Sequence, residues 1–102
     1  MKTAQDVFYK DLEVNLAAHR VSREGHELCL TPREFALLAV LLTHCDKALS
    51  RSQLLEAAWG YAYIGESRTV DMHIRTLRGK LGPYGDRIET VRGVGYRLEG
   101  KP

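Results

Sequence analysis

The chain has 102 residues, 44% of them hydrophobic, and a formal net charge of only +2. This length fits one small globular domain with a core of its own. Its two cysteines and four histidines lack the spacing of a metal site or a disulfide framework, and no apolar run approaches the roughly 20 residues of a membrane span. We therefore expect no metal, no cofactor and no membrane association, and a reducing cytoplasm fits the chain.

Positive charge is concentrated in the C-terminal third. Residues 68–97 hold seven Lys or Arg against three Asp or Glu, whereas the rest of the chain holds eight against ten. This distribution is typical of a domain that presents a basic face to an anionic partner and uses the remainder as scaffold.

The N-terminal part, from about residue 7 to 30, is predicted to form a small antiparallel sheet. Apolar and polar side chains alternate over residues 12–16. Val21 and residues 28–30 predict two more strands around a turn at residues 24–25, and residues 8–9 supply a short first strand.

Two capping boxes predict the first two helices. In Thr31-Pro32-Arg33-Glu34 the threonine is the N-cap, proline takes the first helical position and glutamate follows three residues after the cap. The apolar residues between 35 and 42 make this helix the most buried one, and it should end near residues 44–47. Ser50-Arg51-Ser52-Gln53 repeats the pattern, and Gly60 ends a short second helix after Trp59.

A third helix is predicted over residues 68–81. Its buried side consists of Val70, Ile74, Leu77 and Leu81, spaced at i, i+4, i+7 and i+11. Its outer side carries Arg68, Met72, Arg75, Thr76 and Gly79. The exposed faces of this helix carry four basic residues and only one Asp. Ser67 is the expected N-cap, and Gly82-Pro83 ends the helix.

A β-hairpin follows a turn at residues 83–86. Residues 88–91 and 96–98 alternate as strands across Arg92-Gly93-Val94-Gly95, so a basic residue stands at the tip, within a wing of about residues 87–99. Three helices and then a hairpin are the element order of a winged helix-turn-helix, whose third helix enters the major groove of DNA. An arginine at the hairpin tip suits the adjacent minor groove.

Four motifs in this order resemble the OmpR/PhoB-type DNA-binding domain of two-component response regulators. They are Leu30-Thr-Pro-Arg-Glu-Phe-Ala-Leu-Leu38, Ser50-Arg-Ser-Gln-Leu-Leu55, Arg68-Thr-Val-Asp-Met-His-Ile-Arg75 and Thr90-Val-Arg-Gly-Val-Gly-Tyr-Arg97. The resemblance implies an α+β fold with an N-terminal four-stranded antiparallel sheet, a three-helix body over about residues 31–82, and a C-terminal hairpin that pairs with a short strand after the second helix.

The resemblance also implies site residues. Phosphate contacts are expected from Arg51, Trp59, Arg68, Thr69, His73, Arg75, Arg78 and Tyr96, and we add Lys80. Met72 and Thr76 are expected to face base edges, and Thr90 and Arg92 to contact the minor groove from the wing. Two alternatives stay open: Arg75 pairs with Asp71 four residues earlier, or Trp59 belongs to the core.

The partners that the resemblance implies are double-stranded DNA with direct-repeat half-sites, a second copy bound head-to-tail, RNA polymerase and a receiver domain. These 102 residues hold no receiver domain, so we expect a C-terminal fragment or an unusual stand-alone regulator. The loop over residues 60–67, with Tyr61, Tyr63 and Ile64, either faces the polymerase or folds back onto the domain.

The third helix departs from the family pattern at two places. Family members often carry Arg at the position of Thr76 and a basic residue at that of Gly79. The helix therefore lacks a guanine-reading arginine. Gly79 either permits close approach of the backbone to DNA or marks fraying of the last turn.

Two other functions compete with DNA binding. A winged-helix module for protein interaction would be expected to lack the clustered basic face. An enzyme is disfavoured because no carboxylate pair, nucleophile-base set or phosphate loop stands at usable spacing.

Overall fold

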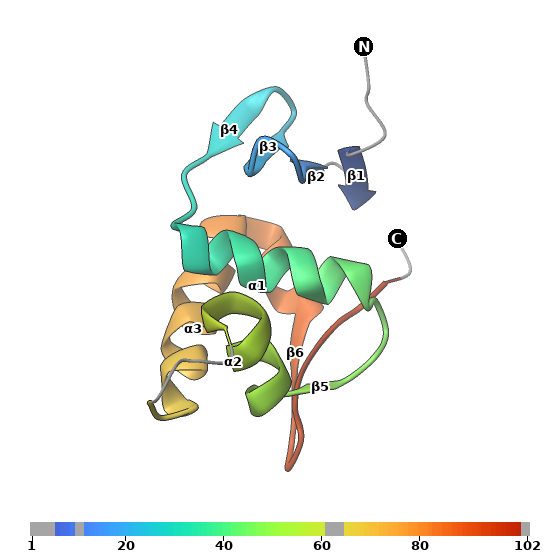
Figure 1. The fold of residues 1–102 in the computed structure, drawn as a ribbon. Coiled ribbons are helices and arrows are strands. Elements are labelled where there is room, and N and C mark those ends of the chain that lie inside the picture. Colours follow the sequence, from blue (N-terminus) through green and yellow to red (C-terminus); the bar gives the residue numbers. More distant parts are fainter. Residues whose placement is uncertain (1–5, 10–11, 61–64, 101–102) are drawn as a thin grey trace.

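The fold places a three-helix body between two small antiparallel sheets (Figure 1). The structure is a computed structural model that describes residues 6–9, 12–60 and 65–100. The first sheet contains β1 (Asp6–Tyr9), β2 (Leu12–Asn15), β3 (Arg20–Arg23) and β4 (His26–Leu28), in that order. The body contains α1 (Pro32–Thr43), α2 (Arg51–Trp59) and α3 (Arg68–Leu81). The second sheet has the order β5-β7-β6, with β5 (Leu49–Ser50), β6 (Ile88–Val91) and β7 (Gly95–Leu98).

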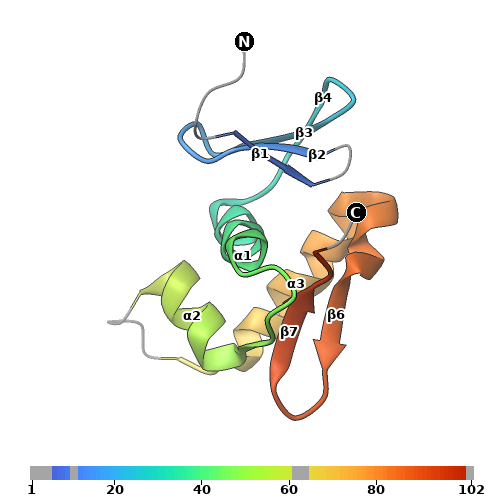
Figure 2. The same cartoon turned by 90° about the vertical axis from the view of Figure 1, so that its right-hand side faces the viewer.

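The predicted fold class, an α+β winged helix-turn-helix, is confirmed. The four-stranded sheet covers one side of α1, and α2, α3 and the β6–β7 hairpin lie on the other side (Figure 2). Both predicted capping boxes are present, with Thr31 and Glu34 at α1 and Ser50 and Gln53 at α2. The stripe of Val70, Ile74, Leu77 and Leu81 is buried, so the opposite side of α3 is left for solvent.

Three local predictions are wrong. The strand that pairs with the hairpin is β5, which precedes α2 instead of following it. Residues 82–87 form a 3-10 helix, η1, instead of a simple turn. Ser67 does not cap α3 with its side chain because it is itself in the right-handed helical conformation, and its carbonyl accepts from the Val70 amide at 3.0 Å.

The wing is held to the helical body by the close approach of β5 and β7. Gly95 stands opposite Ser50 in this pairing, and a Cβ on Gly95 would lie 2.1 Å from the carbonyl oxygen of Leu49. Only glycine fits there. Gly79 differs: a Cβ at that position would meet nothing within 4 Å, and α3 continues past it to Leu81.

Alanine substitutions at Gly95 and Gly79 should change the stability of the domain in opposite directions. Gly95→Ala should lower the free energy of unfolding by about 1 to 3 kcal/mol, because the methyl group forces β5 and β7 apart. Gly79→Ala, the matched control, should raise it by about 0.5 to 1 kcal/mol, because alanine is the better helix former. Urea unfolding of both variants measures these changes. A Gly95→Ala protein as stable as the wild type would contradict the packing described.

Candidate nucleic-acid interface

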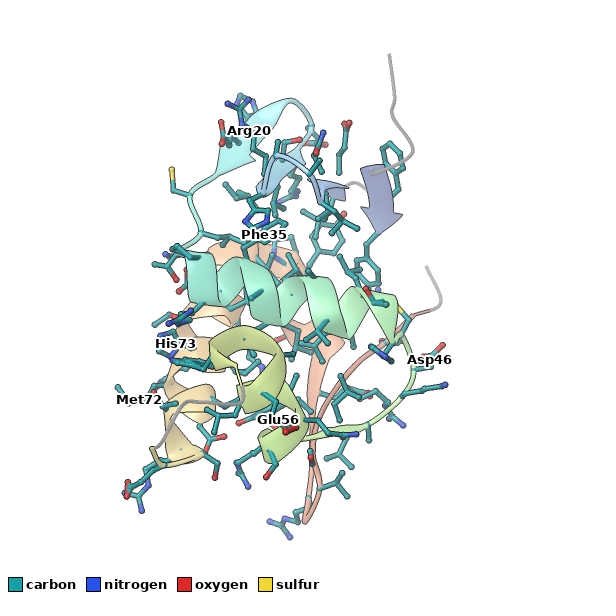
Figure 3. The ribbon with its side chains drawn as sticks, viewed as in Figure 1. Arg20, Phe35, Asp46, Glu56, Met72 and His73 are labelled. Carbon is teal, nitrogen blue, oxygen red and sulfur yellow. The ribbon has the colours of Figure 1, made fainter. Side chains whose placement is uncertain are left out.

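The exposed side of α3 carries cations and one large apolar side chain. Met72 is 64% exposed and points away from the body (Figure 3). Arg68 and Arg75 are exposed on the same helix, and neither forms an ion pair with another residue of the described ranges. This excludes the alternative in which Arg75 pairs with Asp71. The face therefore offers two guanidinium groups to an anionic partner.

A buried carboxylate fixes the N-terminal end of α1 to α3. Glu34 is 2% exposed, and its Oε1 accepts from the Thr31 amide at 2.9 Å and from the Lys80 ammonium at 2.7 Å. Its Oε2 accepts from the hydroxyl of Thr76. Burial alone would raise the pKa of Glu34, but the hydrogen bonds from Lys80, Thr76 and Thr31 outweigh it and lower the pKa to about 2. Glu34 is therefore ionised, and Lys80 is its counter-ion.

A second carboxylate joins α2, α3 and β7. Oδ1 of Asp71 accepts from Nε of Arg51 at 2.8 Å and from the hydroxyl of Tyr96 at 2.5 Å. Burial alone would raise the pKa of Asp71, but these two hydrogen bonds and the charge of Arg51 lower it. Because the Tyr96 proton is used on Asp71, a phosphate contact by Tyr96 requires that bond to be exchanged.

Arg78 connects α3 to the wing. Its guanidinium donates to the Ile88 carbonyl at 2.6 and 3.0 Å and to the Thr90 hydroxyl at 2.9 Å, and it lies 5.5 Å from the ring centroid of Tyr96. Two expected DNA contacts, Arg78 and Thr90, thus contact each other. Arg92 lies exposed at the hairpin tip, where Gly93 supplies a φ of 78°.

Aromatic and basic side chains meet between α2 and α3. Trp59 is half-buried and packs edge-on against His73, with 4.9 Å between ring centroids, and the Arg33 guanidinium lies 5.3 Å from its ring. His73 lies between the two helices in Figure 3, and its Nδ1 is 2.9 Å from the Thr69 carbonyl. Trp59 is therefore neither a fully buried core residue nor a freely exposed one.

Other kinds of site find no support in the described part of the chain. No group of three or more His, Cys, Asp or Glu there is placed to hold a metal ion. None of the described helices has both the length and the apolar character needed to cross a bilayer. A shallow hollow of about 570 Å³ lies beside Met72, Thr76 and Lys80, within the same basic face. Tyr61, Tyr63 and Ile64 lie outside the described residues.

Comparison with known proteins identifies the family. Residues 25–98 match the model described as "Transcriptional regulatory protein, C terminal", which is well over half of the chain. The chain belongs to this family. It is 47% identical over 94 residues to the transcriptional regulatory protein YkoG of Bacillus subtilis, covering 90% of this chain and 41% of YkoG. It is 43% identical over 103 residues to SrrA of Staphylococcus aureus, covering 96% of this chain and 43% of SrrA.

A solved structure agrees with this assignment. The DNA-binding domain of RstA from Klebsiella pneumoniae, in complex with the RstA box, superposes with a TM-score of 0.82 at 30% identity. The match covers 95% of this chain and 99% of the RstA domain. The chain itself spans less than half the length of the curated relatives YkoG and SrrA.

Within this regulatory domain, the expected arginine, lysine and tyrosine contacts fall into two groups. Arg68, Arg75 and Arg92 have no ion-pair partner among the described residues. Arg51, Arg78, Lys80 and Tyr96 are bonded to other parts of the domain. The sequence did not reveal the second role of Glu34, because its capping position explains it locally while Thr76 and Lys80 are 42 and 46 residues away.

The buried Glu34 predicts a specific dependence of stability on pH. Because its pKa is lowered from 4.5 to about 2 in the folded state, its contribution is complete above about pH 4.5 and is lost as the pH falls towards 2. Between about pH 5 and pH 2.5 the wild type should lose about 2 to 3 kcal/mol more than Glu34→Gln. Denaturant unfolding at each pH measures this difference. Equal losses in both proteins would show that Glu34 is not held as a carboxylate.

Proposed function

We propose that this domain binds double-stranded DNA sequence-specifically and regulates transcription as the C-terminal effector domain of a two-component response regulator. In this proposal α3 enters the major groove and the β6–β7 hairpin contacts the adjacent minor groove. The observation that carries it is a set of three exposed guanidinium groups with no ion-pair partner among the described residues: Arg68 and Arg75 on α3 and Arg92 on the wing. The complex of the RstA domain with its box supports it.

The two elements of the basic face, a helix and a hairpin tip, suit the two grooves of duplex DNA. An α-helix fits the major groove, which is about 12 Å wide. A guanidinium at the hairpin tip suits the narrower minor groove, where the negative potential is strongest over A/T-rich sequence. Arg92 is exposed at that tip, beside Val94, which is 45% exposed. The two elements would therefore contact neighbouring grooves from one side of the duplex.

The bonded cations are proposed to act differently from the free ones. Arg78 sets the position of the wing against α3, and Asp71 holds Arg51 and Tyr96 next to the same helix. Such preorganisation lowers the entropy lost on binding. Arg51 donates to Asp71 through Nε, so its terminal nitrogens can still donate to a phosphate. Thr69, His73, Trp59, Lys80 and Thr90 are proposed to add contacts at the edges of this surface.

The wider partners belong to the same proposal. We expect two copies to bind head-to-tail on direct-repeat half-sites, a phosphorylatable receiver domain to control them, and residues 60–67 to contact RNA polymerase. The family match to the C-terminal part of transcriptional regulatory proteins supports the receiver partner. Gly60, Gly65 and Glu66, which border the loop, are exposed.

The proposal predicts phosphate-driven binding that depends on α3. The affinity for duplex DNA should fall with salt, with a log-log slope of about 0.9 per neutralised phosphate. Arg75→Ala should weaken binding and reduce that slope by about 1. Fluorescence anisotropy with a labelled duplex at several salt concentrations measures both.

Arg20→Ala is the matched control, because Arg20 lies on the N-terminal sheet, far from α3 in Figure 3, and is also exposed. It removes the same charge and should leave the slope unchanged. A slope near zero for the wild type, or equal effects of both variants, would rule out the proposed interface.

A further inference from the structure

The hydroxyl proton of Thr76 is already used inside the protein. Thr76 lies on the outer side of α3, yet both acceptors of its hydroxyl belong to the protein: Oε2 of Glu34 and, at 3.1 Å, the His73 carbonyl of the preceding turn. The carboxylate accepts the Thr31 amide and the Lys80 ammonium on its other oxygen, so it is ionised and has no proton to give. In this hydrogen bond Thr76 must therefore be the donor. A hydroxyl has a single proton, and towards solvent it keeps lone pairs and the neighbouring methyl group.

Met72 extends this surface by one helical turn. Residues four apart lie on the same side of a helix, and the Met72 side chain is 64% exposed. Its thioether donates no hydrogen bond. The middle of α3 therefore presents an acceptor and two apolar groups, with no donor among Met72, Thr76 and Gly79.

In the major groove, one kind of base pair matches such a surface. Adenine offers an amino donor at N6, and its partner thymine offers a methyl group at C5. Guanine offers only acceptors, N7 and O6, which an acceptor oxygen repels. A G·C pair retains the amino donor of cytosine but has no methyl group.

We infer that Thr76 and Met72 select an A·T pair under the middle of α3, and that Glu34 is the positioning residue that sets this preference by keeping Thr76 an acceptor. The inference rests on the proposed function and adds to it the base class that is read and the buried residue that controls the reading.

Glu34→Gln tests directly whether Glu34 makes the Thr76 hydroxyl an acceptor towards the DNA. The Gln amide oxygen can keep the place of Oε1, with the Thr31 amide and Lys80, as Gln53 does with the Ser50 amide in the second capping box at 2.8 Å. The amide nitrogen then takes the place of Oε2 and donates to Thr76. The hydroxyl proton of Thr76 then has two remaining acceptors, the His73 carbonyl at 3.1 Å and a base in the groove. When it donates to the base, the same threonine is a donor, which suits the acceptors of guanine.

The experiment is selection of bound sequences from a random duplex pool, followed by anisotropy titrations with single base-pair replacements in the selected site. The wild type should prefer A·T over G·C at one position of each half-site by about three- to tenfold, the range for one hydrogen bond. Thr76→Val keeps the shape of threonine and should lose the preference for an amino donor. Glu34→Gln should shift that position towards guanine.

Glu56→Gln is the matched control, since it makes the same chemical change at an exposed site on α2 and should leave every base preference as in the wild type. A loss of affinity without a changed preference at one position would mean that Glu34 has only a structural role. Unchanged preferences in both Glu34→Gln and Thr76→Val would overturn the inference, while salt-dependent binding would leave the proposed function intact. Failure of the wild type to enrich any sequence would overturn both.

Urea unfolding shows whether each variant is folded. If Glu34→Gln does not fold, Thr76→Val decides the outcome, because the Glu34 carboxylate there keeps its bonds from the Thr31 amide and the Lys80 ammonium.

Discussion

The buried carboxylate of Glu34 is the constraint on which the geometry of the domain depends. A charge removed from water is costly unless it is paired and fully hydrogen-bonded. Here the pairing partners come from the cap of α1 and from α3, so satisfying the charge fixes one helix against the other. Its partners Thr76 and Lys80 both lie on the basic side of α3. The same ion pair that completes the core thus sets what that side offers to a ligand.

Two further side chains, Asp71 and Arg78, connect the helices to the wing. Asp71 joins α2 to β7 through Arg51 and Tyr96, and Arg78 joins α3 to the start of β6 at Ile88. Each removes a cation or a hydroxyl from the set of free donors. In exchange, α3 and the hairpin keep a fixed relative position before any partner binds, which favours simultaneous contact with two grooves. Arg68, Arg75 and Arg92, which have no ion-pair partner within the described ranges, then lie on elements whose relative position is already fixed.

Most of the fold was predictable because its signals are local. The capping boxes at Thr31 and Ser50 and the apolar spacing within α3 each depend on residues within a few turns of one another. The position of β5 was not predictable, because a two-residue strand carries no alternation and forms only where Gly95 lets β7 approach. Ser67 was misassigned because the sequence of a good cap does not fix its backbone conformation.

The candidate site was predictable in outline only. Periodicity identified the exposed side of α3, including Met72, and charge identified its basic character. The sequence could not separate the cations that bond to other parts of the domain from those that do not. The partner of Arg78 lies in a later strand, and that of Lys80 lies in an earlier helix. Those contacts arise from tertiary packing. They are also what separates the arginines that we propose as direct DNA contacts from the groups that position them.

We propose that the domain binds duplex DNA through α3 and the wing, with the N-terminal sheet turned away. An NMR titration of the ¹⁵N-labelled domain with a duplex selected from a random pool tests it most directly. We expect the largest amide shift changes on residues 68–80, on the N-terminal turn of α2 and on residues 91–95, while β1–β4 remain unchanged. Changes concentrated on β1–β4, with α3 unaffected, would contradict it.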